Sequence, residues 1–279
     1  QVLIPLAAMA VKPEKTGEVL GFLMSGLLVG LLLSTSLAGL LSNLFNWKLI
    51  YVVSAVLMLI LAFLLKAKLP SIPVFKMSYA NIFKSMALLL KEEPRLGLRA
   101  LVGGFAFAAM SILFSTIAVL LTSSPFNLSD VLVGVVTLIG VFGALATAKI
   151  GKIADQGHTQ SLTWIGLFVL AISWLFFYWG GQYLFSYIIG YGVISLGLTI
   201  VHTSNQNIIF RLRPDSKSRI NAIYMTAYFI GGACGSALGV YSWHHGGWSM
   251  TCLAGLCLVT CSALFALLDQ RHHAKAHPI

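Results

Sequence analysis

The chain has 279 residues, of which 58% are hydrophobic and only 9% are charged. A soluble domain of this length needs far more charge to cover its surface, so the composition excludes an ordinary water-soluble protein. The formal net charge of +10 is also typical of nucleic-acid-binding proteins, but here the basic residues gather at alternate connections between apolar segments. We therefore expect no nucleic-acid partner.

The first apolar stretch, residues 2–11, is too short to cross a membrane. At 1.5 Å per residue it covers about 15 Å, half of the hydrocarbon core. It also lacks the charged start and the cleavage site of a signal peptide. Since the sequence begins with Gln1, we interpret this stretch as the inner end of a helix that starts upstream.

Eight longer apolar segments follow, and each is long enough to cross a core of roughly 30 Å as a helix. A helix satisfies its own backbone hydrogen bonds in lipid. The sequence therefore predicts an all-α polytopic membrane protein with eight full transmembrane helices and one partial helix. The predicted spans are residues 19–41, 47–65, 97–122, 129–148, 161–179, 183–210, 220–242 and 248–268.

The basic residues indicate the orientation of these spans. All but one of the 18 lysines and arginines lie in one alternating set of connections, and the exception is Lys48. Basic residues beside membrane spans stay on the cytoplasmic side. We therefore expect a multi-pass membrane protein, in contact with membrane lipid, with its C-terminus in the cytoplasm.

A polar interval at residues 66–96 divides the chain into two parts. Within it, Ile82, Phe83, Met86, Leu89 and Leu90 share one helical face, which predicts an amphipathic helix on the inner membrane surface. We expect residues 1–65 to be the remainder of an N-terminal bundle, and 66–96 a cytoplasmic linker. Residues 97–268 would form a six-helix C-terminal bundle, and 269–279 a cytoplasmic tail.

A weak internal repeat relates the first span to the seventh. Gly30, Leu37 and Trp47 recur at one constant offset as Gly231, Leu238 and Trp248. Parallel repeats are typical of transporters, although glycine ladders also serve helix packing in lipid.

Three segments resemble the major facilitator superfamily, specifically its bacterial drug and sugar (arabinose-type) efflux branch. The first is the span at 19–41, whose small residues have the spacing of the family's antiporter motif without its proline. The matching positions are Gly21, Gly30, Ser34, Ala38 and Gly39. A plain small-residue packing face is the alternative interpretation of these positions.

The second and third segments lie in the C-terminal part. Residues 151–158 are similar to the family's cytoplasmic gating motif, with Gly151, Lys152 and Asp155 at matching positions. Residues 217–248 resemble the eleventh helix of efflux-type members, with Arg219 at its cytoplasmic entrance. The resemblance implies that Asp155 faces a helix N-terminus when the inner side is closed. A solvated loop turn is the alternative for the gating segment.

The resemblance implies two six-helix bundles around a central cavity, with this chain lacking the first three and a half helices. It also implies that the spans at 97–122 and 183–210 line the cavity. The candidate lining residues are Phe107, Met110, Ser111, Phe114, His202, Asn205, Gln206 and Tyr224. His202, Asn205 and Gln206 share one helical face, so an interhelical hydrogen-bond cluster is the alternative to a solute or proton site.

The expected function is a secondary active transporter that exports a small organic solute, drug-like or sugar-like, by proton antiport with alternating access. An inactive fragment of such a transporter and a solute–proton uptake symporter are the alternatives. All eight acidic residues are expected in loops or at span ends, so coupling would depend on His202 or on upstream helices. No catalytic motif is present. We expect no enzyme activity, no cofactor, no metal and a monomer.

Overall fold

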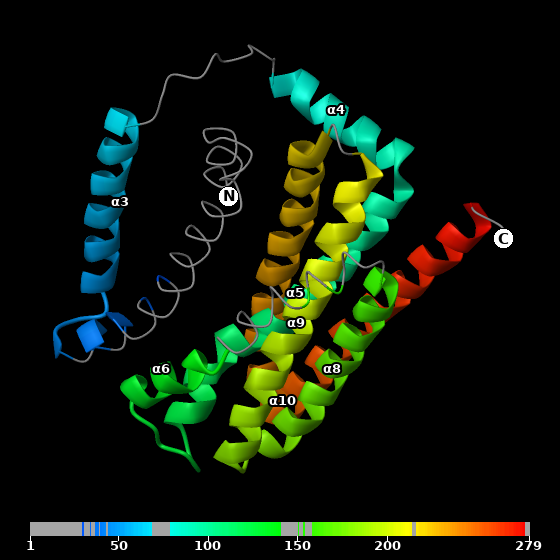
Figure 1. Ribbon diagram of the computed structural model, residues 1–279. Coiled ribbons are helices and arrows are strands. Elements are labelled where there is room, and N and C mark those ends of the chain that lie inside the picture. The colour runs from blue at the N-terminus through cyan, green and yellow to red at the C-terminus, as the bar shows by residue number, and fades with distance from the viewer. Residues whose placement is uncertain are drawn as a thin grey trace. The chain divides into compact units, whose positions relative to one another are not determined.

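The computed structural model describes residues 44–68, 79–140, 158–213 and 216–276, together with 30, 34, 37, 38, 40–42, 150 and 153 (Figure 1). All regular structure within these residues is helical, which confirms the all-α class. The helices are α3 (Leu49–Lys68), α4 (Tyr79–Glu92), α5 (Pro94–Thr122), α6 (Asp130–Leu138), α8 (Thr159–Gly180), α9 (Leu184–Leu212) and α10 (Lys217–Ala276).

The chain divides into two compact units. One unit contains residues 1–70 and 129–141, and the other contains residues 71–128 and 142–279. In the first unit, α3 exposes apolar side chains on every side, as a helix surrounded by lipid does. The short α6 begins after Ser129, whose hydroxyl accepts a hydrogen bond from the backbone N–H of Leu132 at 3.4 Å. The domain boundaries expected from the sequence stay a prediction.

The second unit is built around α5, which packs against both halves of α10. The long α10 is interrupted at Gly247, whose φ of 61° and ψ of −152° are not helical. Glycine adopts this positive φ without the steric cost of a Cβ atom. The break divides α10 into a first arm, residues 217–246, and a second arm, residues 248–276, which returns along the bundle in red in Figure 1.

The first arm approaches the backbone of α5 closely. A Cβ atom on Gly231 would collide with the carbonyl of Gly104, and one on Gly235 would collide with the carbonyl of Ala108. The contacted residue on α5 moves from Gly104 to Ala108 as the glycine on the first arm moves from Gly231 to Gly235, so the two helices are parallel. The second arm is antiparallel to α5, because Ser262 donates a hydrogen bond to the carbonyl of Val102 at 2.8 Å, whereas the later Asp269 contacts the earlier Arg99.

Helices α8 and α9 form an antiparallel hairpin that joins the same unit. Gly166 of α8 lies against Ile200 and Val201 of α9, while Gly180 lies against Tyr187 near the connection. The indole of Trp248 closes this end of the bundle by donating to the carbonyl of Phe177 at 2.6 Å. Small residues at helix crossings and amphipathic rings at helix ends are both typical of membrane bundles.

Five helices in the described part of the chain are long and apolar enough to cross a membrane. They cover residues 49–67, 94–122, 159–180, 184–212 and 217–272, and the last is the two-armed α10. The predicted spans at 47–65, 97–122, 161–179 and 183–210 coincide with the first four within a few residues. Those at 220–242 and 248–268 fall on the two arms. The span at 19–41 lies largely outside the described residues, and the one at 129–148 is described only as far as residue 140, so the total count stays a prediction.

The amphipathic segment expected in the linker is helical, as α4. Its Leu89 is buried in an apolar cluster with Leu96 of α5 and Ile209 of α9, and Met86 packs against that cluster. Phe83, which was predicted on the same face, is 69% exposed. At the corner with α5, the carboxylates of Glu92 and Glu93 accept hydrogen bonds from Arg213 at 3.2 and 2.8 Å. These contacts attach α4 to the ends of α5 and α9.

Candidate functional site

Two charged side chains lie in the interior of the second unit. Arg99 and Asp269 are the only charged residues among the fully buried side chains of the described residues, and both are 0% exposed. Arg99 lies in the second turn of α5, which begins at Pro94, and Asp269 lies near the end of the second arm of α10. Because α5 and this arm are antiparallel, their opposite charges meet at one end of the bundle.

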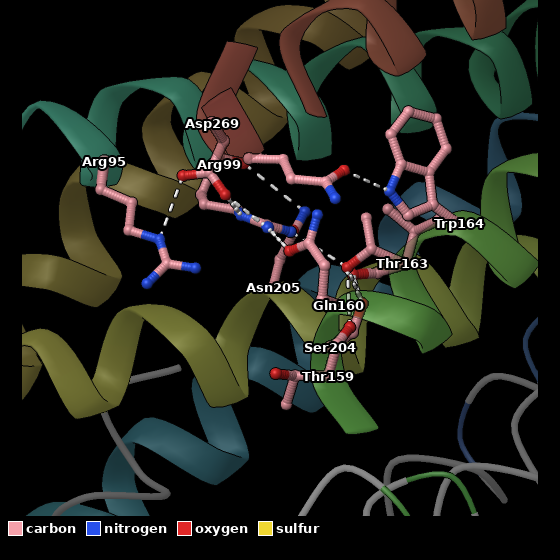
Figure 2. Close-up of polar contacts among 11 residues, drawn as sticks. Arg95, Arg99, Thr159, Gln160, Thr163, Trp164, Ser204, Asn205 and Asp269 are labelled. Carbon is pink, nitrogen blue, oxygen red and sulfur yellow. Dashed lines mark hydrogen bonds and ion pairs between the residues drawn. The ribbon is translucent and has the colours of Figure 1, made fainter. Parts of the chain in front are cut away.

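The guanidinium of Arg99 donates all five of its N–H groups to acceptors on three other helices (Figure 2). Nε donates to Oδ2 of Asp269 at 2.8 Å, and Nη2 donates to the same oxygen and to Oε1 of Gln160. Nη1 donates to Oγ1 of Thr163 at 3.0 Å and to Oδ1 of Asn205 at 3.2 Å. The hydrogen-bonding capacity of Arg99 is therefore filled by the protein itself.

The acceptors are in turn held by their own neighbours. Thr163 donates to the carbonyl of Thr159 at 3.0 Å, and its oxygen lies 3.1 Å from Oγ of Ser204. Oδ1 of Asp269 accepts from Nε of Arg95 at 3.1 Å. We name these residues the Arg99 network: Arg95, Arg99, Gln160, Thr163, Ser204, Asn205 and Asp269. It joins α5, α8, α9 and the second arm of α10.

The Arg99 network explains how a charge is accommodated inside an apolar bundle. An unpaired ion costs several kcal/mol when it leaves water, so a buried arginine requires a counter-ion and further acceptors. Asp269 supplies the opposite charge, and neutral oxygens satisfy the remaining N–H groups. Two arginines share one carboxylate, and Arg95 retains contact with the exterior, since its side chain is 21% exposed.

A second cluster combines aromatic rings with a histidine. Oη of Tyr224 lies 3.2 Å from Nδ1 of His202. The ring of Tyr228 stacks on Phe107, with centroids 4.1 Å apart, and lies 5.0 Å from the centroid of His202. We name Phe107, His202, Tyr224 and Tyr228 the histidine–aromatic cluster. It brings together α5, α9 and the first arm of α10, and it offers aromatic rings beside one imidazole.

The predicted cavity residues fall into different places. Phe107, His202 and Tyr224 meet in the histidine–aromatic cluster, whereas Asn205 belongs to the Arg99 network. Met110 and Ser111 are buried within the bundle, Phe114 is 52% exposed, and Gln206 is half-buried on α9. The lining of a solute cavity by these residues stays a prediction.

The predicted motif residues are described only in part. Gly151, Lys152 and Asp155 of the gating motif lie outside the described residues, as do Gly21 and Gly39. Gly30, Ser34 and Ala38 are helical. Arg219 is exposed on the first turn of α10, where Nη2 donates to Oγ of Ser216 at 2.9 Å. The gating and antiporter roles of these residues stay predictions.

Sequence reasoning missed the Arg99 network. All eight acidic residues were expected in loops or at span ends, and Asp269 does lie near the end of a helix. The full burial of Asp269 and its pairing with the buried Arg99 were not predicted. A signal was nevertheless present. Arg99 lies two residues inside one predicted span and Asp269 one residue beyond another, and the basic-residue pattern places both at the inner end. Opposite charges at equal depth indicate an ion pair.

Comparison with known proteins identifies the family. The profile of the Major Facilitator Superfamily matches residues 1–236. An uncharacterized transporter of Escherichia coli O157:H7, YgaY, is 41% identical over 256 residues, which cover 91% of this chain and 65% of that protein. A Streptomyces coelicolor protein that also carries the name of a transporter is 24% identical over 265 residues, covering 93% of this chain and 61% of its own length.

The chain therefore spans less than two thirds of the length of the relatives it matches. The family profile nevertheless covers most of the chain, and the described helices are of membrane-crossing length. This chain is a multi-pass membrane protein and belongs to the major facilitator superfamily of transporters.

Proposed function

We propose that the full-length protein is a secondary active transporter that exports a small organic solute across the bacterial inner membrane in exchange for protons. The histidine–aromatic cluster carries this proposal. It offers the stacked rings of Phe107 and Tyr228 next to His202, and all three lie on membrane-crossing helices. Apolar walls with a few polar groups are typical of small-molecule sites.

The chemistry of the cluster favours an amphipathic solute with a planar apolar part. The ring faces of Phe107 and Tyr228 suit such a part, because aromatic rings stack favourably on one another. His202 and the hydroxyl of Tyr224 supply hydrogen-bonding groups within 3.2 Å of each other. An imidazole ring can bind and release a proton, so His202 is the proposed proton-binding group of this bundle.

The direction of transport is proposed from the resemblance of residues 217–248 to efflux-type members and from the small-residue spacing at 19–41. The alternating arrangement of basic residues supports a cytoplasmic C-terminus. The gating segment at 151–158 would close the inner side of the cavity, with Asp155 and Arg219 in charged contacts there.

The test is flux in everted membrane vesicles that contain the full-length protein. A panel of planar amphipathic solutes and sugars is supplied outside, and respiration generates the proton gradient. Accumulation that an uncoupler abolishes supports proton-driven export, and His202→Gln is expected to reduce it about tenfold or more, within the usual contribution of a proton-transferring group. Arg213→Lys is the matched control, because Arg213 contacts Glu92 and Glu93 away from the cluster.

Other outcomes contradict the proposal. Accumulation in right-side-out vesicles alone would assign the protein to solute–proton uptake instead. Absence of gradient-driven flux for the whole panel, with protein present in the membrane, would contradict proton-coupled export of these solutes. Flux that His202→Gln leaves unchanged would remove the proton-binding role from His202.

A further inference from the structure

We infer that Arg99 is a positioning residue for the histidine–aromatic cluster: its guanidinium holds α9 against α5 and thereby sets the geometry of the contact between His202 and Tyr224. This inference rests on the proposed function, in which that cluster binds the solute and the proton. The guanidinium donates to Gln160, Thr163, Asn205 and Asp269, so its effect on His202 passes through the residues it binds.

The saturation of Arg99 argues against a direct role in binding. All five N–H groups already have acceptors on α8, α9 and α10, and the side chain is 0% exposed. A solute could accept a hydrogen bond from Arg99 only by displacing one of these acceptors, because no N–H group of Arg99 is left over. A group with no remaining donor capacity positions its neighbours instead.

Asn205 connects the Arg99 network to His202. Arg99 binds this residue at both ends of its amide, because Nη1 donates to Oδ1 at 3.2 Å and Nδ2 lies 3.5 Å from the backbone carbonyl of Arg99. Asn205 follows His202 by three residues on α9, so both side chains lie on one face of that helix. The two hydrogen bonds to Asn205 therefore determine how α9 is rotated about its axis at His202 and how far it is shifted along that axis.

Tyr224 is placed by the same stretch of α5. A Cβ atom on Gly103 would lie 2.5 Å from the hydroxyl oxygen of Tyr224, so this hydroxyl rests directly on the α5 backbone. Gly103 follows Arg99 by one helical turn. Both partners of the hydrogen bond between His202 and Tyr224 are thus placed relative to adjacent turns of α5, one by the Arg99 side chain and the other by the Gly103 backbone.

The geometry requires arginine rather than a general positive charge. A lysine ammonium has three donors on a flexible stem, whereas the guanidinium holds five donors in a planar fork. Arg99→Lys can retain the ion pair with Asp269 but cannot also reach Gln160, Thr163 and Asn205. It therefore separates the charge of Arg99 from its positioning role.

The experiment compares Arg99→Lys, the double variant Arg99→Met/Asp269→Leu and the control Arg213→Lys in the full-length protein. Three quantities are measured: melting temperature, solute export, and the NMR signal of the His202 ring in histidine-labelled protein. The signal is identified by its loss in His202→Gln. Arg213→Lys changes an arginine of the same unit whose carboxylate partners lie outside the network, and it is expected to leave all three unchanged.

Arg99→Lys is expected to shift the His202 signal and to lower export between about tenfold and hundredfold, as small misplacements of binding groups do. In the double variant no buried charge is left unpaired between positions 99 and 269, so the melting temperature is expected to recover toward wild type. Export is expected to stay low, because Asn205 still lacks its donor.

Two results would overturn the inference. One is a folded Arg99→Lys protein with an unchanged His202 signal. The other is a double variant in which export recovers together with the melting temperature, since that outcome assigns Arg99 a purely structural role. If even the wild type exports no solute, the proposed function fails, and the His202 signal alone then decides whether Arg99 positions His202.

Discussion

At the scale of single residues, the cost of a buried charge decides which side chains tolerate substitution. Arg99 and Asp269 are both 0% exposed, while the ion pair of Arg213 with Glu92 has side chains that are 42% and 44% exposed. Water screens the second pair and weakens it. The first pair has no such alternative, so loss of Asp269 leaves the Arg99 charge without solvent or counter-ion.

Asp269→Asn is therefore expected to destabilise the protein by about 3–5 kcal/mol, the range for breaking a buried ion pair. Glu92→Gln is the matched control at an exposed pair, with an expected loss of about 1 kcal/mol or less. Denaturation of the purified protein in detergent measures both. Equal melting temperatures for the two variants would contradict the buried position of Asp269.

The hydroxyl of Tyr224 provides a second test at this scale. Tyr224→Phe removes the hydrogen bond to His202 and keeps the ring, so we expect a loss of about 0.5–1.5 kcal/mol and a change in solute affinity. Tyr228→Phe is the control, because Tyr228 contacts Phe107 and His202 through its ring. Melting curves and a binding titration with a transported solute distinguish them. A larger effect in the Tyr228 variant would contradict the hydrogen bond.

Asp155 belongs to the proposed gating segment. Asp155→Asn removes the charge that would complement a helix N-terminus in the inward-closed state, so transport is expected to slow while membrane insertion stays normal. Vesicle flux and the amount of inserted protein are measured together. Asp130→Asn, at the start of α6, is the control. Unchanged flux from a well-inserted Asp155 variant would remove this residue from the gate.

At the scale of elements, the backbone contact between α5 and the first arm of α10 holds the second unit together. Small residues allow this approach, and packing of this kind is a main source of helix association in lipid. The same helix pair carries Gly103 and Tyr224, so a change in its spacing also changes the histidine–aromatic cluster. Packing and site geometry are therefore linked through one interface.

Gly235→Ala tests this interface. Its Cβ atom would collide with the backbone of Ala108, which cannot move aside as a flexible side chain can, so we expect a loss of about 1–3 kcal/mol from overpacking. Gly97→Ala is the control, because its Cβ atom would meet only the Leu90 side chain at 3.7 Å. Alanine favours helix more than glycine, so the control is expected to be neutral or stabilising. Melting temperatures compare the two, and a stable Gly235 variant would contradict the close approach.

At the scale of the whole molecule, the distribution of basic residues determines the predicted orientation in the membrane. In a cysteine-free background, Lys48→Cys is expected to react with a membrane-impermeant maleimide from the outside of intact cells. Lys91→Cys is expected to react only after the membrane is opened, because it belongs to the opposite set of connections. Reaction of both positions from the same side would contradict the alternating topology.

The all-helical class and the positions of most described spans were predictable from the sequence. Length and apolarity suffice for this purpose, because in lipid the backbone must satisfy its own hydrogen bonds and a helix does so within one segment. The turn between the last two spans was also predictable, and the structure places it at Gly247. These features depend on local sequence, so they do not require knowledge of which helices are neighbours.

The two clusters depended on tertiary structure. His202 and Asn205 were recognised as polar residues on one helical face, but the sequence could not assign their partners. Tyr224 lies on another helix, and Arg99 and Asp269 are 170 residues apart. Positions in a sequence do not specify how helices rotate about their axes or which ends meet. Packing of small residues against backbone determines both the rotation of the helices and the ends that meet. It thereby places Arg99 and Asp269, which the sequence puts near span ends, in the buried centre of the Arg99 network.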